Sequence, residues 1–406
     1  MTKTVVVVGS LDTKGEEYAL VKKLIESHGL NTLVVDFGVM GQPYFEPDIS
    51  RNRVAAAGGG ELDYLAGGEH KDEAMQTMAT GLAAVVRWLY DEGRLDGIIG
   101  MGGTGGTSIT TTAMRTLPVG VPKLMLSTLG GGDVSAYAGT RDITFMPSIV
   151  DVAGINSISR RIYANAAGAI AGMVLTEAPA GEEKPLITAS MFGNTTDCVN
   201  RARRFLEGRG YEVLVFHATG TGGRTMESLI ADGYIDGSLD ITTTELADEV
   251  CGGVFSAGPD RGMAASRAGI PAVIVPGCVD MANFGGVETM PQKYRDRTLY
   301  KWNPNVTLLR TNVAENTRIG EMIAAAANAA TAPVTIVLPL KGVSMLDSEG
   351  NQFWDPEADR ACFDAIRRDL NPGIRVVEME ANINDEAFAD TCATLLLDML
   401  VEDQEG

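Results

Sequence analysis

The sequence predicts an α/β protein made of two Rossmann-like domains, each with a mostly parallel sheet. Short apolar segments such as TVVVVG (4–9) and PAVIVPG (271–277) alternate with longer amphipathic ones, which is typical of parallel strands covered by helices on both faces. The 406 residues are more than one ordinary core accommodates. Many of the 48 glycines follow the apolar segments directly, which indicates special backbone geometry at the strand ends.

The first domain is expected over residues 1–178. Its apolar segments predict strands, some with the loop that follows them, at 4–9, 32–38, 96–103, 122–133 and 143–154. Its amphipathic or small-residue segments predict helices at 15–28, at 72–92 and at 156–177. A further short helix is expected directly after the glycine-rich loop at 100–107. Strand and helix therefore alternate throughout this domain, as a parallel sheet requires.

A polar stretch with two prolines, APAGEEKP, separates the two halves and predicts a linker over 179–185. The second domain then covers 186–406. Its strands are expected at 185–196, 211–223, 271–277, 305–310, 332–340 and 374–380, and its helices include 199–206 and 385–400. Both domains carry a Gly-Thr-Gly-Gly element, at 103–106 and 220–223, which remote duplication and convergence explain equally well.

The net charge of −20, without any run of lysine or arginine, argues against a nucleic-acid partner. An anionic small molecule is still compatible, because backbone amides and helix N-termini bind phosphate locally. The apolar N-terminal segment is too short for a signal peptide, and no segment is long enough to cross a membrane. The five cysteines are odd in number and form no C-x-x-C pair, which argues against structural zinc or a disulfide framework and favours a cytoplasmic protein.

The stretch GMGGTGGTS (100–108) has the composition of a phosphate-binding loop but fits neither common motif. Gly100, Gly102 and Gly105 match the dinucleotide fingerprint G-x-G-x-x-G, yet they follow the third strand and no acidic residue lies about twenty positions later. A Walker A loop would need lysine where Gly106 stands. The loop amides and the Thr107 hydroxyl can still hold a phosphate, so the positive charge must come from elsewhere.

Lys14, in the loop after the first strand, is the expected source of that charge. Asp12 beside it could orient Mg2+ through water, because this ion keeps several of its waters in proteins. The competing interpretation is that Asp12 caps a helix and Lys14 lies in solvent. Three polar loops, at 9–15, 100–107 and 127–133, are expected at one edge of the sheet, and their convergence favours a binding site.

Several long motifs are similar to those of one family. GSLDTKGEE, VVDFGV, GMGGTGGT, LPVGVPKLMLST and MPSIVDVAGINSISR resemble the Tm-1-like ATP-binding domain, and FHATGTGGRTMESLI, ELADEVCGGVFSAGPDR, GIPAVIVPGCVDMANF and LPLKGVSMLD resemble its partner domain in the uncharacterised protein family UPF0261. The resemblance implies a first domain that binds ATP, within a dimer. It implies cofactor contacts at Gly9, Ser10, Asp12, Thr13, Lys14, Gly102, Gly103, Thr104, Gly105, Gly106, Thr107, Ser127 and Thr128.

The second domain carries the residues expected to do chemistry. His217 ends a strand just before a glycine-rich loop and is expected to be a general base or an anion clamp. With Glu245 and Asp280 it forms the candidate catalytic set. A small anionic ligand is expected to contact Thr219, Gly220, Thr221, Gly222, Gly223, Arg224, Asp260, Arg261, Cys278 and Asn283.

Structural interpretations compete for each of these residues. His217 could bond to backbone at its strand end, Asp260 and Arg261 could form an ion pair, and Cys278 could be a small buried apolar side chain. Cys278 as a nucleophile would need His217 as its base. A single histidine within a motif also offers too few nitrogen ligands for zinc, so the metal expected is the Mg2+ that accompanies ATP.

The sequence is therefore expected to encode a cytoplasmic ATP-binding protein that forms a dimer or a higher homo-oligomer. One expected function is an ATP-dependent step on the small anionic metabolite held by the second domain. The alternatives are a non-catalytic, nucleotide-responsive binding or regulatory protein, and an ATP-independent hydrolase or lyase confined to the second domain.

Overall fold

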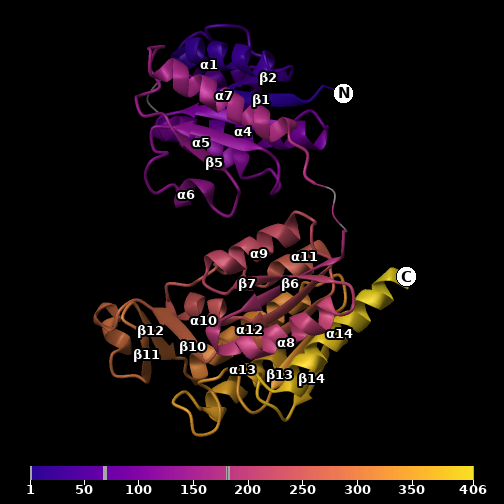
Figure 1. Ribbon diagram of the computed structural model, residues 1–406. Coiled ribbons are helices and arrows are strands. Elements are labelled where there is room, and N and C mark those ends of the chain that lie inside the picture. The colour runs from indigo at the N-terminus through magenta and orange to yellow at the C-terminus, as the bar shows by residue number, and fades with distance from the viewer. Residues whose placement is uncertain (1, 67–70, 180, 182, 406) are drawn as a thin grey trace. The chain divides into compact units, whose positions relative to one another are not determined.

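The computed structural model describes residues 2–66, 71–179, 181 and 183–405 (Figure 1). The chain divides into two compact units, Met1–Gly181 and Glu182–Gly406. Each unit is an α/β structure around a parallel sheet, so the fold class predicted from the alternating apolar segments is confirmed.

The first unit is built on a five-stranded parallel sheet with the order β2-β1-β3-β4-β5. Its strands are β1 Thr4–Gly9, β2 Asn31–Asp36, β3 Gly97–Gly102, β4 Lys123–Ser127 and β5 Thr144–Pro147. The central strands are buried along their length, which explains why their sequences are apolar without alternation.

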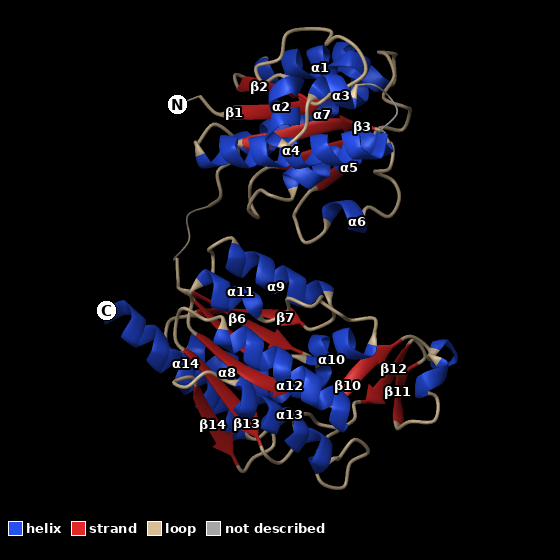
Figure 2. Ribbon diagram, turned by 180° about the vertical axis from the view of Figure 1, so that it is seen from behind, coloured by secondary structure: helices blue, strands red, loops and turns tan. Residues whose placement is uncertain are grey.

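Helices cover both faces of this sheet. One face packs against α1 Leu11–Glu26 and α7 Ser159–Leu175. The other face, in front in Figure 2, packs against α2 Arg51–Ala57, α3 Leu62–Leu65, α4 Lys71–Asp91 and α5 Thr104–Met114. The short α6 Ser135–Ala138 lies between β4 and β5. Two apolar cores result, one on each side of the sheet.

The second unit is built on a six-stranded parallel sheet with the order β14-β13-β9-β8-β6-β7. Its strands are β6 Leu186–Met191, β7 Glu212–His217, β8 Gly237–Thr242, β9 Ala272–Gly277, β13 Val334–Pro339 and β14 Arg375–Met379. The helices α8 Thr196–Glu207 and α14 Glu386–Glu405 cover one face. The other helices of the unit are α9 Thr221–Ala231, α10 Thr244–Cys251, α11 Met263–Ala268, α12 Val313–Asn328 and α13 Pro356–Asp369.

A small antiparallel sheet extends the second unit at one side (Figure 1). It has the order β10-β12-β11, with β10 Met281–Phe284, β11 Leu299–Asn303 and β12 Val306–Arg310. The sequence predicted β12 as one more strand of the alternating series and did not predict its two partners. The segment LYKWN of β11 is exposed over its last three residues, so it lacks the apolar run that reveals a parallel strand.

Candidate functional site

The strand order of the first unit places a crevice at the ends of β1 and β3. From these neighbouring strands the chain continues in opposite directions, to β2 on one side and to β4 on the other. Ligands of open α/β sheets bind at such a switch point, outside the carboxyl ends of the strands. The loop from β1 into α1 and the loop from β3 into α5 both lie there, and they contain the first two of the three predicted loops.

Packing accounts for two glycines of the GMGGTGGTS loop. A Cβ atom at Gly100 would lie 2.5 Å from Cγ2 of Thr110, and one at Gly102 would lie 3.2 Å from Cα of Gly106. Both glycines therefore let α5 approach β3 closely, and neither needs a ligand to explain it.

The next three glycines have no such explanation. A Cβ atom at Gly103, Gly105 or Gly106 would find its nearest neighbours at 3.8, 3.5 and 3.5 Å, which is ordinary van der Waals contact. None of the three has the positive φ angle that favours glycine. Glycine at these three positions leaves the backbone of the loop open to the close approach of another group.

These glycines open an 11-residue helix whose N-terminus is uncapped. Gly103 is the N-cap of α5 and has no side chain with which to cover the amides of the first turn. Those amides and the helix dipole together attract an anion. Thr104 is exposed there, whereas Thr107 is buried, and its hydroxyl lies 2.7 Å from that of Ser127. The side chains of Thr107 and Ser127 thus fix the loop from inside rather than facing the crevice.

An apolar cavity of about 390 Å3 adjoins the same loop. It is lined by Phe37, Val39, Met40, Leu65, Lys71, Ala74, Met75, Met78 and Ile109. Met75 joins the cavity to the loop, because its methyl group is the atom 3.5 Å from a Cβ atom placed at Gly105. This cavity is not visible in the sequence, because Ala74, Met75 and Met78 fit the apolar face of an ordinary helix.

Lys14 is already engaged within the protein. It has non-helical angles (φ −136°, ψ 24°) inside α1, and its ammonium group donates to the backbone oxygen of Val152 at 2.5 Å. Lys71 lines the apolar cavity and is a second basic residue at this edge. Nothing in the sequence singles out Lys71, because it lies in a polar stretch far from the glycine motif.

Asp12 ties the β2 loop to the start of α1. Its Oδ2 accepts hydrogen bonds from the backbone N–H groups of Met40 (2.7 Å) and Gly41 (3.1 Å). Its Oδ1 is buried and has no hydrogen-bond partner among the described residues. Asp12 therefore holds the segment that carries Met40, one wall of the cavity, and its Oδ1 packs against Gly38, where a Cβ atom would lie 2.4 Å away.

The remaining predicted residues of this edge lie close by. The hydroxyl groups of Ser10 and Thr13 are 2.9 Å apart at the start of α1. The N–H group of Thr128 donates to the oxygen of Gly102, at the end of β3. Gly9 leaves room for the ring of Tyr18, which would lie 2.1 Å from a Cβ atom at this position.

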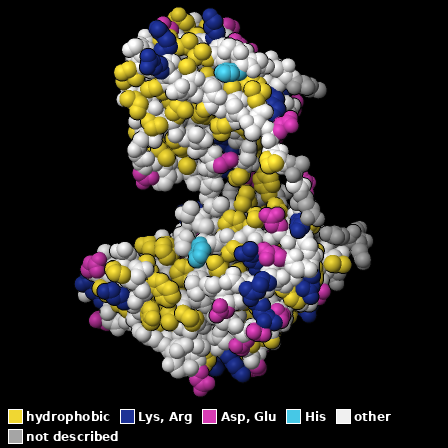
Figure 3. Space-filling view, in the orientation of Figure 1, with side chains coloured by type: hydrophobic (Ala, Val, Ile, Leu, Met, Phe, Trp, Pro, Cys, Tyr) yellow, Lys and Arg dark blue, Asp and Glu magenta, His cyan; other side chains and the backbone are white. Residues whose placement is uncertain are grey.

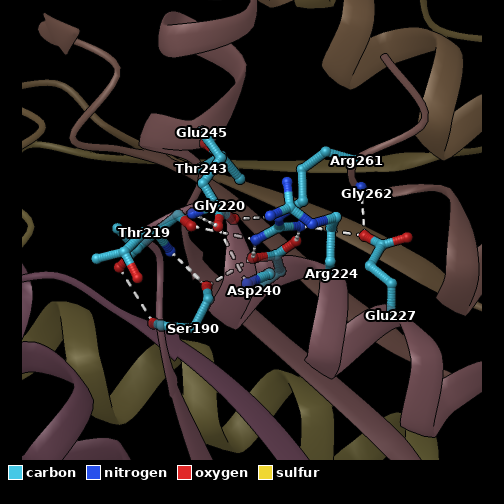
Figure 4. A network of polar contacts seen from close by, with 12 residues as sticks. Ser190, Thr219, Gly220, Arg224, Glu227, Asp240, Thr243, Glu245, Arg261 and Gly262 are labelled. Carbon is cyan, nitrogen blue, oxygen red and sulfur yellow. Dashed lines mark hydrogen bonds and ion pairs between the residues drawn. The ribbon is translucent and has the colours of Figure 1, made fainter. Parts of the chain in front are cut away.

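In the second unit, the corresponding Gly-Thr-Gly-Gly loop is occupied by a side chain of the protein itself (Figure 4). The Glu245 carboxylate accepts hydrogen bonds from the N–H groups of Gly220 (2.6 Å) and Gly223 (3.0 Å). A Cβ atom at Gly223 would lie 2.0 Å from Glu245 Oε2, and Gly220 has a φ of +79°. Packing and backbone conformation therefore account for these glycines, and a carboxylate already holds the amides that could bind an anion.

Arg261 connects Glu245 to two further carboxylates. It is fully buried, donates to both oxygens of Asp240 at 2.6 and 2.7 Å, and donates to Glu245 at 2.6 Å and Glu227 at 3.3 Å. Burial disfavours the charged guanidinium, but these carboxylates outweigh it and raise the pKa of Arg261 above its usual value. The guanidinium group of Arg261 is thus engaged by carboxylates of the protein itself (Figure 4).

His217 lies apart from Asp280, one of the other two candidate catalytic residues. Its side chain is exposed at the end of β7, with Thr219 in the loop that follows and Thr221 and Arg224 in the first turn of α9. Three strand spacings separate β7 from β9, after which Asp280 lies, so the two backbones are roughly 14 Å apart. The side chain of Glu245 points instead into the loop at the start of α9. The three residues therefore do not converge on one reacting atom.

Cys278 and Asp280 belong to a buried region beyond β9. Cys278 has a φ of +56°, uncommon for a side chain of this kind, and burial raises the pKa of its thiol well above the usual range. Burial, and then the charge of Asp347, raise the pKa of Asp280 to about 7. Ser344 donates to Asp280 at 2.9 Å. A thiol in this environment is protonated and lacks the character of a nucleophile.

Two other predicted contacts have structural partners. The Asn283 side chain donates to Asp248 at 2.7 Å inside the protein, and exposed Asp260 pairs with Arg267 at 3.4 Å. Within the described part of the chain, no cluster of three or more His, Cys, Asp or Glu residues could hold a metal ion. The five cysteines all lie in that part, and each is free and buried.

On the face of the second unit drawn in Figure 3, acidic and basic side chains are intermixed. Among the described helices, none combines the length and the apolar character needed to cross a membrane.

The comparisons with known proteins place both units in one family. Residues 3–179 match the N-terminal domain, and residues 184–400 the C-terminal domain, of the uncharacterised protein family UPF0261. Among solved structures, the thioesterase domain from the curacin biosynthetic pathway aligns over 54% of this chain and 92% of that chain, at 12% identity and a TM-score of 0.28. A similarity at that level carries no argument about function.

Two relatives extend the match along most of the chain. A UPF0261 protein of Clostridium tetani is 50% identical over 402 residues, which cover 98% of this chain and 100% of the relative. The ToMV resistance protein Tm-1(GCR237) of Solanum lycopersicum is 41% identical over 334 residues, which cover 80% of this chain but 44% of the tomato protein. The resemblance inferred from the motifs is confirmed at the family level: the chain belongs to the UPF0261 family, with Tm-1 of tomato among its homologues.

Proposed function

We propose that the first unit binds a nucleoside triphosphate, ATP being the one expected, at the carboxyl edge of its sheet. The observation that carries the proposal is the open glycine loop at the start of α5. Neither packing nor backbone conformation requires glycine at positions 103, 105 and 106, and these residues leave the first-turn amides uncovered.

The neighbouring cavity suits the other end of such a ligand. A phosphate chain at the α5 amides and a planar base in an apolar space of about 390 Å3 would be contiguous, because Met75 borders both. Ligand sites of this kind combine apolar walls with a few placed polar groups. Among the described residues that line the cavity, the side chains are apolar apart from Lys71, so the cavity selects a planar ring by its shape rather than by hydrogen bonds.

Two lysines are candidates for neutralising the negative charge of the phosphates. Lys71 lines the cavity, and Lys14 is bonded to Val152 and would have to turn from that carbonyl to reach a phosphate. Asp12, which the sequence predicts to orient Mg2+ through water, would have to turn from the Met40 and Gly41 amides to offer an oxygen to that ion. When bound, ATP would supply phosphoryl-transfer chemistry, whereas the residues described here bind and orient it.

The proposal does not extend to the second Gly-Thr-Gly-Gly loop. An anionic metabolite there would have to displace Glu245 from two amides and from Arg261. The structure therefore favours nucleotide binding in the first unit over the anionic ligand expected for the second.

The proposal is tested by calorimetric titration of ATP and Mg2+ into the full chain and into Gly105→Val. A Cβ atom fits at Gly105, so the variant should fold while its branched side chain enters the space reserved for the ligand. ATP affinity should fall by about tenfold or more, since the phosphates lose their close approach to the amides.

Gly168→Val is the matched control. Gly168 is also a helical glycine, on α7, and nothing lies within 4 Å of a Cβ atom there. It should bind ATP like the unaltered chain. Equal ATP affinity in Gly105→Val, or no ATP binding by the unaltered chain, would overturn the proposal.

A further inference from the structure

The strands β1 and β3 part just before the glycine loop. They pair from Val5 with Gly97 to Val8 with Gly100, after which β1 turns into α1 while β3 continues to Gly102. The backbone N–H and C=O groups of Met101 on that side therefore have no β1 residue opposite them with which to form hydrogen bonds. Buried backbone groups without partners are costly, so something must replace the strand.

The hydroxyl of Tyr18 replaces it. This hydroxyl donates to the Met101 oxygen at 2.6 Å and accepts from the Met101 N–H group at 2.8 Å. Tyr18 projects from α1 and is fully buried. One side chain thus makes both hydrogen bonds that the neighbouring strand would have made.

Gly9 admits the tyrosine ring to this place. A Cβ atom at Gly9 would lie 2.1 Å from the ring, so any other residue would push Tyr18 away from β3. The glycine that the sequence assigned to the cofactor is therefore required by Tyr18.

On its other side, the end of β3 is fixed by β4. Gly102 pairs with Ser127, Thr128 donates to the Gly102 oxygen at 3.2 Å, and the hydroxyl groups of Thr107 and Ser127 are 2.7 Å apart. With Tyr18 on the β1 side, both flanks of the strand that delivers the glycine loop are held. A preorganised loop loses less free energy when it binds a ligand.

We propose that Tyr18 is a positioning residue for the nucleotide site: its hydroxyl holds the end of β3 so that the amides of Gly103 to Gly106 face the crevice. The inference rests on the proposed function and adds a residue that does not itself touch the ligand. Without the hydroxyl, both Met101 groups lose their partner, and β3 with the glycine loop shifts to recover hydrogen bonds.

The test compares Tyr18→Phe with Tyr163→Phe in the full chain. Tyr163 is a buried tyrosine of the same core, on α7, and its hydroxyl has no hydrogen-bond partner among the described residues. ATP and adenosine are titrated into each variant, well below its melting temperature. Tyr18→Phe should bind ATP about tenfold more weakly and adenosine with unchanged affinity, because the phosphate loop moves and the apolar cavity does not.

Gly9→Ala supplies a second variant that keeps the hydroxyl but displaces the ring, and it should show the same selective loss of ATP affinity. Tyr163→Phe should match the unaltered chain for both ligands. Unchanged ATP affinity in Tyr18→Phe, or an equal loss in Tyr163→Phe or for adenosine, would overturn the inference alone. Failure of the unaltered chain to bind ATP would instead overturn the nucleotide proposal, and the inference with it.

Discussion

The glycine amides at the start of α5 and of α9 face different surroundings. The two Gly-Thr-Gly-Gly elements are indistinguishable in sequence, yet one leaves its amides open and the other surrounds the Glu245 carboxylate. Glu245 lies 22 residues beyond Gly223, so only the folded structure, in which the Glu245 side chain reaches from α10 to the start of α9, reveals the contact. A glycine motif alone therefore cannot tell an open anion site from one that the protein has filled.

The first prediction concerns which lysine neutralises the phosphates of the proposed ligand. Lys71→Ala should weaken ATP binding more than Lys14→Ala, because Lys14 is bonded to Val152 whereas Lys71 lines the cavity beside the glycine loop. The expected loss is about tenfold for a single charge contact. Titration of ATP at two salt concentrations would check it, since a charge contact weakens as salt rises. A larger loss in Lys14→Ala would restore the assignment made from the sequence.

At the scale of elements, the parallel strands were predictable and the small antiparallel sheet was not. A buried parallel strand such as β1 is apolar throughout, and its ends are marked by glycine. By contrast, β10 has four residues and follows Asp280, so its sequence resembles a ligand-binding loop. For the same reason, the sequence predicted that Asn283 contacts a substrate. In the structure, its side chain donates a hydrogen bond to Asp248 inside the protein.

The contact between α10 and α9 gives the prediction at the scale of elements. Glu245→Ala removes a carboxylate from two amides and from buried Arg261, and should lower the free energy of unfolding by about 3–5 kcal/mol. Formate should partly restore stability, because it fits the space between the same donors. Urea denaturation with and without formate measures both effects.

Glu207→Ala is the control for that experiment. Glu207 pairs with Arg203 at 2.7 Å on the exposed surface of α8, where an ion pair contributes about 0.5 kcal/mol or less. A Glu245→Ala variant as stable as Glu207→Ala would show that the filled glycine loop does not hold the second unit together.

At the scale of the whole molecule, the two units have the same fold class but differ at the carboxyl edges of their sheets. In the first, the switch point combines an open helix N-terminus with an apolar cavity. In the second, the switch-point region is closed by carboxylates, by Arg261 and by buried polar side chains. The sequence predicted the parallel sheets and the loops at their edges, because both follow from apolar runs ending in glycine. It could not predict which edge is open, since that depends on side chains brought from distant segments.

The most direct test of this account is hydrogen–deuterium exchange of the full chain with and without ATP and Mg2+. The account predicts that ATP slows exchange at the start of α5, over residues 103–107, and in the cavity wall around Met40 and Met75. Exchange at residues 220–223 should not change, because Glu245 already holds those amides. Protection of residues 220–223 without protection of 103–107 would contradict the central claim that the first unit is the nucleotide site.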